Sequence, residues 1–186
     1  LLEAPIYHDE NMPDSPLRPS GLLYDTISAT DIKQKRFVPM RCLDPKATMW
    51  MKAGEDSCAI GGPIGPDGSV TKFGEIFFDN RFDTTKQFHE LEDHRVLLIA
   101  STSVSKEGRG GGWGTTMYLS LLYDGYTLVS DSEQYAGGKA LWEKLIKVGP
   151  QHNVHVYIMQ YGRLMRDAKG KPLEYNGKNI NADEIW

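Results

Sequence analysis

The chain has 186 residues, which fits one catalytic domain with a core of its own. Hydrophobic residues make up 40% of it and charged residues 25%, a composition typical of folded globular proteins, which excludes a disordered chain or a coiled coil. A net charge of −4 gives no electrostatic drive toward nucleic acid, and the longest apolar run, Val96 to Ala100, is too short to span a membrane.

Two cysteines, Cys42 and Cys58, are too few for a disulfide framework, so we expect a reducing compartment and a cytoplasmic location. The histidines show neither a CxxC companion nor an HExxH frame, so we expect no metal.

The first half of the chain gives few signals. Residues 1 to 20 hold four prolines, which exclude a helix and favour an extended arm. Residues 25 to 36 permit a short helix capped by Ser28 or Thr30. A strand over 48 to 60, a Gly- and Pro-rich hairpin connection over 61 to 69 and a second strand over 70 to 79 follow. Residues 80 to 95 predict either a loop or a weak helix.

The second half is clearer. Residues 96 to 100 form an apolar run rich in branched residues, typical of a buried strand. Apolar residues at helical spacing then predict a helix over 115 to 123, ended by Gly125. A strand over 126 to 129, a second helix over 136 to 148 and a strand over 153 to 159 complete an α/β arrangement with a central sheet.

The segment Arg109-Gly-Gly-Gly-Trp-Gly114 separates the buried strand from the helix. In this position, exposed backbone N–H groups and the helix dipole can hold a phosphate, and an arginine can add paired hydrogen bonds. The plainer alternative is that the glycines form only a tight or flexible connection. No GxxxxGK[ST] occurs, and the spacing of a dinucleotide fingerprint is missing.

The pattern Arg109-x-x-Gly112-x-Gly114 resembles the pyrophosphate signature R-x-x-G-x-G/A of the GCN5-related N-acetyltransferase (GNAT) superfamily, and ALWEKLIKVG (140 to 149) resembles its second shared element. The resemblance covers roughly residues 96 to 160, the cofactor half. It implies an α/β fold with a mixed, mostly antiparallel central sheet flanked by helices, in a single domain over 21 to 186 that follows an extended, Pro-rich N-terminal arm over 1 to 20.

The resemblance also implies an activity, the transfer of an acetyl group from acetyl-CoA to an amine of a protein or small molecule. Val104 falls where the family's fourth strand ends, and its backbone would bind the pantetheine arm and the oxyanion. The cofactor-binding residues that the resemblance implies are Val104, Arg109, Gly110, Gly111, Gly112, Trp113, Gly114 and Thr115.

Residues 124 to 145 are also similar to acyltransferase-like proteins of bacteriophages, which would imply a host protein as target or a virion-associated role.

The match departs from the family at the residue that commonly protonates the leaving thiolate. Trp142 stands where the family has tyrosine, and an indole N–H is not a usable acid. Either Tyr135 or Tyr157 serves instead, or water does, or the protein binds acyl-CoA without rapid transfer; Trp142 itself can be a core residue. For the general base, Glu75 and Asp79 are candidates that can equally be ordinary carboxylates.

A second departure lies in residues 20 to 50, which hold little helix where the family has two helices between its first strands. The sequence therefore leaves two functions open. One is an N-acyltransferase; the other is a non-catalytic interaction protein with this fold, such as a phage component or an inhibitor of a host protein.

Overall fold

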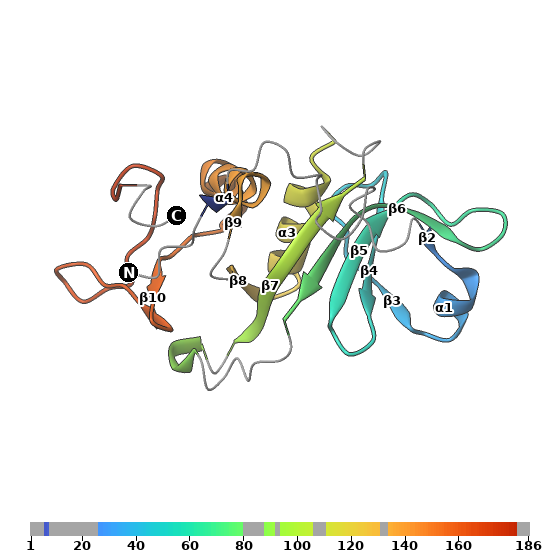
Figure 1. Ribbon diagram of the computed structural model, residues 1–186, viewed down its shortest axis with the longest axis horizontal. Coiled ribbons are helices and arrows are strands. Elements are labelled where there is room, and N and C mark those ends of the chain that lie inside the picture. Colours follow the sequence, from blue (N-terminus) through green and yellow to red (C-terminus); the bar gives the residue numbers. More distant parts are fainter. Residues whose placement is uncertain are drawn as a thin grey trace.

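A computed structural model describes residues 6–7, 26–79, 88–91, 94–105, 111–130 and 134–181, with the backbone alone at 6–7 and 134–137. Its main feature is a seven-stranded, mostly antiparallel sheet with the path β3-β4-β5-β6-β7-β8, to which β2 adds beside β6 (Figure 1). The strands are β2 (Thr26–Ile27), β3 (Phe37–Met40), β4 (Thr48–Lys52), β5 (Ser57–Gly61), β6 (Val70–Phe78), β7 (Arg95–Val104) and β8 (Tyr126–Ser130).

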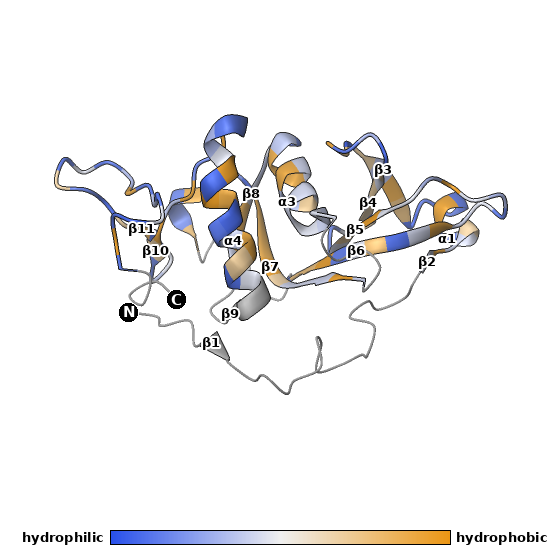
Figure 2. Cartoon of the chain, turned by 90° about the horizontal axis from the view of Figure 1, so that it is seen from above, coloured by the Kyte–Doolittle hydropathy of each residue, from blue (hydrophilic) through white to orange (hydrophobic). Residues whose placement is uncertain are grey.

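Only β7 and β8 run parallel in this sheet, joined by the crossover helix α3 (Trp113–Tyr123). After β8 the chain forms α4 (Ala136–Val148), and both helices lie on the same face of the sheet (Figure 2). The fold is therefore α/β, with a mostly antiparallel sheet and few helices. Within the described residues, no helix is both long and apolar enough to cross a membrane.

The two faces of the sheet bury separate apolar clusters, because side chains alternate along each strand. Cys58 and Ile60 of β5 point to the helix side and pack with Met117 and Leu145. Ala59, between them, points to the opposite face. There it packs in a second cluster whose other buried members are Ile27, Trp50 and Val70.

Most elements predicted after residue 95 are confirmed. The apolar run 96 to 100 lies in β7, where residues 97 to 99 are buried and Ala100 is exposed. Helix α4 has the predicted bounds, and β8 covers the expected strand. Helix α3 begins two residues earlier than predicted, and Gly125 follows its C-cap with a φ of 86°.

In the first half, the hairpin connection over 61 to 69 is confirmed, because β5 and β6 pair antiparallel on either side of it. Helix α1 (Ala29–Lys33) is the expected short helix, and the Ser28 side chain accepts a hydrogen bond from the Asp31 N–H. The single strand predicted over 48 to 60 is wrong, because Gly54 and Glu55 have positive φ and turn the chain between β4 and β5.

The strand predicted over 153 to 159 is also wrong. Asn153 has a φ of 54° and ends the short helix η2 (Gly149–His152), and within the following residues only Tyr157 forms a bridge, to Glu174. A small hairpin of β10 (Met159–Gln160) and β11 (Arg163–Leu164) follows.

Two predictions concern segments that are described only in part. Of the N-terminal arm, the described residues form β1 (Ile6–Tyr7), which pairs in parallel with β9 (Gln134–Tyr135). Of residues 80 to 95, the described part contains the 3-10 helix η1 (His89–Leu91) and the start of β7. The rest of both segments lies outside the described residues.

Candidate functional site

The parallel pair β7/β8 opens partway along its length. Backbone pairing runs from Arg95 opposite Tyr126 to Ile99 opposite Ser130, where β8 ends. Strand β7 continues to Val104, still paired with β6 on its other side. Residues 101 to 104 therefore present one backbone edge that no described strand covers. Such an edge offers N–H and C=O groups to an extended ligand.

A β-bulge marks the point where the two strands separate. Phe77 lies opposite Ser101 and Phe78 opposite Ile99, so Ala100 is an extra residue on β7. A bulge bends its strand and increases the local twist. The bulge directly follows Ile99, the last residue of β7 that pairs with β8, so the described pairing ends where β7 bends.

Helix α3 begins beyond the end of β7 and has an open N-terminus. Its N-cap is Gly112, in the left-handed conformation with a φ of 77°, and no side chain caps the helix. The N–H groups of Trp113, Gly114 and Thr115 donate to no described residue. This is the arrangement that holds phosphates in other proteins.

The residues around this N-terminus also have packing roles. The Trp113 ring stacks on Phe73 of β6 with their centroids 5.0 Å apart. A Cβ on Gly114 would lie 3.5 Å from both methyl carbons of Leu141 on α4, so this glycine lets α3 and α4 approach closely. Thr115 is buried in the first turn.

Sequence reasoning missed a lysine at this place. A Cβ on Gly112 would lie 3.8 Å from Lys144 Nζ, so α4 brings an ammonium group to the positive end of the α3 dipole. Lys144 makes no ion pair with a described residue. The Lys144 ammonium group and the positive end of the α3 dipole repel each other unless an anion binds between them. The signal that could have found this lysine is its spacing of three from Leu141, which puts both residues on the face of α4 toward α3.

Trp142, the departure from the family pattern, is a core residue. It is 9% exposed and meets the ring of Tyr118 edge-on, with centroids 5.4 Å apart and planes at 83°. Tyr118 in turn shares a hydrogen bond of 3.0 Å with Thr102 Oγ1, in the part of β7 that runs past β8. The interpretation of Trp142 as core packing is thus the one that its contacts support.

Glu75 lies beside the opening but is committed to another partner. It pairs in register with Ser103 of β7 on one side and with Ala59 of β5 on the other, which places it on the face away from the helices. Its carboxylate is 2.9 Å from Lys72 Nζ, and both side chains are almost wholly buried. The Glu75 carboxylate is thus engaged in a buried ion pair, which supports a structural role.

Asp79 and Tyr157 lie away from the opening. Asp79 follows β6 at its far end, where its N–H donates to the Leu98 carbonyl. Tyr157 is 44% exposed; its backbone forms a β-bridge with Glu174, and its ring lies near that of His155. The Tyr135 side chain lies outside the described part, as do Arg109 and Gly110.

A separate polar cluster lies at the opposite end of β7 and β8, where both strands begin. The Tyr126 hydroxyl donates to Glu55 at 2.7 Å and accepts from Arg95, and the Arg95 guanidinium lies 3.9 Å above the Tyr126 ring. Burial, and then the hydrogen bond to Glu55, raise the pKa of Tyr126 to about 12. These groups border a hollow of about 320 Å³, but they satisfy one another, so we assign them a structural role.

No protein-family model, curated protein or solved structure matches this chain. Among the described residues, no group of three His, Cys, Asp or Glu side chains lies close enough together to hold a metal ion. The functional conclusion therefore depends on the geometry of the opening and of the helix that follows it.

Proposed function

We propose that the protein is an N-acyltransferase that moves an acetyl group from acetyl-CoA to an amine of a protein or small molecule, with a GNAT-like arrangement of its sheet. The observation that carries the proposal is the conjunction at β7: a backbone edge over 101 to 104 that no described strand covers, followed by a helix N-terminus at Gly112 that no described side chain caps. An extended chain ending in a diphosphate suits both features.

Each part of acetyl-CoA would meet a different group of this chain. The diphosphate would accept hydrogen bonds from the free N–H groups of the first turn of α3, with Lys144 and Arg109 supplying positive charge. The pantetheine arm would run along the uncovered edge toward Val104. A backbone N–H near Val104 would stabilise the oxyanion that forms when the amine attacks the thioester carbonyl.

The reaction also needs a base that takes a proton from the amine and an acid that protonates the thiolate. Glu75 is nearest to the opening among the predicted bases, but its ion pair with Lys72 supports a structural role. Trp142 cannot donate a proton to the thiolate. We therefore propose water as the acid and expect turnover to be slow, since general acid catalysis by a side chain is worth about 10² to 10⁴ in rate.

Two glycines provide a matched experiment. Gly112 and Gly125 both have positive φ, and a methyl group at either position meets open space or only the end of the Lys144 side chain. Gly112→Ala and Gly125→Ala should therefore lose similar stability, about 1 kcal/mol from left-handed strain. Only Gly112→Ala should weaken acetyl-CoA binding in calorimetry, by about tenfold or more.

A second pair of variants, at two lysines of α4, tests the role of the Lys144 charge. Lys144→Gln should weaken acetyl-CoA binding, whereas Lys147→Gln, an exposed lysine on the same helix, should not. If wild-type protein gives no binding heat with acetyl-CoA, or if both members of each pair behave alike, the acyltransferase proposal is wrong.

The buried Trp142 favours a second candidate, an interaction protein that keeps the fold without rapid transfer, such as a phage component or an inhibitor of a host protein. The two candidates differ in one measurement. Tight acetyl-CoA binding with thiol release in the presence of a host lysate supports the enzyme, and tight binding without thiol release supports the interaction protein.

A further inference from the structure

The β10–β11 hairpin carries a tyrosine in a backbone conformation that tyrosine rarely adopts. Gln160 pairs with Arg163, so the turn consists of Tyr161 and Gly162, whose φ angles are 52° and 73°. A two-residue hairpin turn with both φ angles positive favours Asn-Gly, because bulky side chains are strained there. Tyr161 thus stands where this type of turn favours asparagine.

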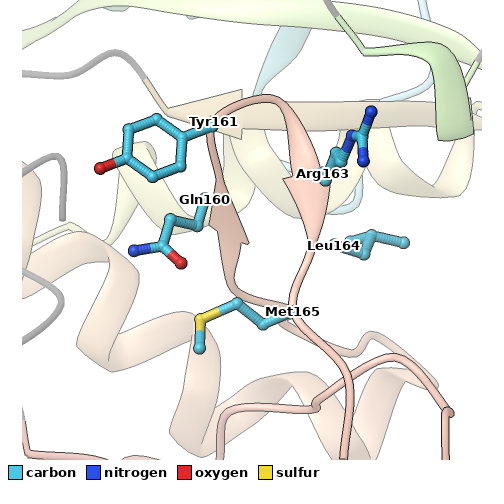
Figure 3. A pocket seen from close by; sticks show the side chains of 5 residues that line it. All are labelled: Gln160, Tyr161, Arg163, Leu164 and Met165. Carbon is cyan, nitrogen blue, oxygen red and sulfur yellow. The ribbon is translucent and has the colours of Figure 1, made fainter.

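The Tyr161 side chain is displayed on the surface. It is 70% exposed, the largest exposure among the large hydrophobic side chains of the described residues. A hollow of about 520 Å³ adjoins it, lined by Gln160, Tyr161, Arg163, Leu164 and Met165 (Figure 3). A strained, exposed aromatic residue beside a hollow is typical of a recognition site.

The hairpin is anchored, so the display is rigid. Met159 of β10 packs against a buried cluster of Phe88, Leu91 and Leu98, which ties the hairpin to β7 and to the 3-10 helix before it. Arg166, just after β11, pairs with Glu90 of that same helix. A ligand therefore meets a preformed surface.

The charge of this region differs from that of the rest of the chain. Residues 159 to 171, which include the hairpin, contain four Lys or Arg and one Asp, a formal charge of +3 within a chain of −4. Unlike Arg166, Arg163 makes no ion pair with any described residue. Tyrosine and arginine are also the residues most enriched at the centres of protein interfaces.

The direction of the side chains indicates the kind of ligand. In Figure 3, Tyr161 projects to one side of the turn and Arg163 to the other, so a ligand that contacts both must reach across the hairpin. A free phosphate or carboxylate is too small to do so. An extended peptide can place a carboxylate on the guanidinium and an apolar side chain on the ring.

We propose that the β10–β11 hairpin binds an acidic segment of a partner protein, with Arg163 taking a carboxylate and Tyr161 an apolar neighbour. This surface is separate from the opening between β7 and β8, and the inference does not depend on acetyl-CoA binding.

The test uses two labelled peptides with blocked ends, one alternating glutamate with leucine and the other with glutamine at each glutamate position. Fluorescence anisotropy with the full chain should show binding of the glutamate peptide and much weaker binding of the glutamine peptide. Arg163→Gln and Tyr161→Asn should each weaken binding of the glutamate peptide by about tenfold or more.

Stability provides the control for misfolding. Tyr161→Asn relieves the strain, so its thermal midpoint should rise by about 2 to 4 °C while its affinity falls. Lys35→Asn is the matched variant, because Lys35 is also exposed with a φ of 53° and carries a positive charge. It should gain similar stability and keep wild-type affinity. Equal binding of both peptides, or wild-type affinity in Tyr161→Asn, would overturn the inference.

Discussion

The buried pair of Lys72 and Glu75 allows a sharp test of whether Glu75 is structural. The two charged atoms are 2.9 Å apart, and the side chains are 2% and 3% exposed. At an effective dielectric constant of about 20, their attraction is about 6 kcal/mol, most of which offsets the loss of hydration on burial. Removing one partner takes away the contact at 2.9 Å while the other charge stays buried, and breaking a buried pair in this way costs about 3 to 5 kcal/mol.

We therefore expect Glu75→Gln to lower the free energy of unfolding by about 3 to 5 kcal/mol in urea titrations, and Lys72→Met to lower it by a similar amount. The double variant should recover much of that loss, because the two opposite charges are removed together. A double variant as unstable as the sum of the two single variants would refute the reasoning. If the stable double variant retained no acetyl transfer while binding acetyl-CoA normally, Glu75 would be the base after all.

Three further predictions concern other residues. Because the folded-state pKa of Tyr126 lies above its ordinary value of 10.0, the folded protein holds that proton longer. The stability that the protonated Tyr126 hydroxyl contributes is complete below about pH 10 and is lost as the pH rises through about 12. In an ultraviolet titration, Tyr126→Phe should remove the ionisation step near pH 12. Trp142→Phe should lower stability by about 1 to 3 kcal/mol in thermal unfolding and leave any transfer rate unchanged, since the indole is a packing group; a large loss of rate in the folded variant would contradict this. Burial raises the pKa of Cys58, and to a lesser degree that of half-buried Cys42, so a thiol reagent should modify Cys58 only after denaturation.

The sequence predicted those elements whose signals are local. The apolar run in β7, the helical spacing in α3 and α4 and the turn residues between β5 and β6 each depend on neighbours a few positions apart. The turn between β4 and β5 was missed although Gly54, Asp56 and Ser57 are residue types that favour turns. The contact of the Glu55 carboxylate with Tyr126, 71 residues further along the chain, could not be read from the local sequence.

The half of the candidate site for which we propose phosphate binding was predictable in the same local way, since a glycine N-cap before an apolar helix can be recognised from residue order. Lys144 was not, because its approach to Gly112 depends on how α4 packs against α3. The close contact of Gly114 with Leu141 brings the two helices together and carries Lys144 to the same end. One small residue thus serves the packing of the helices and the charge of the site at once.

The opening depends on three features of neighbouring strands. Strand β8 stops at Ser130, the bulge at Ala100 bends β7 at that level, and β6 still supports β7 as far as Val104. Without the bulge, every side chain of β7 beyond it would point to the other face, because a slip of one residue reverses the alternation. Thr102 would then turn away from Tyr118, and the uncovered edge would lose the helix that supports it. A single inserted residue therefore determines whether β7 can serve as one wall of a binding site.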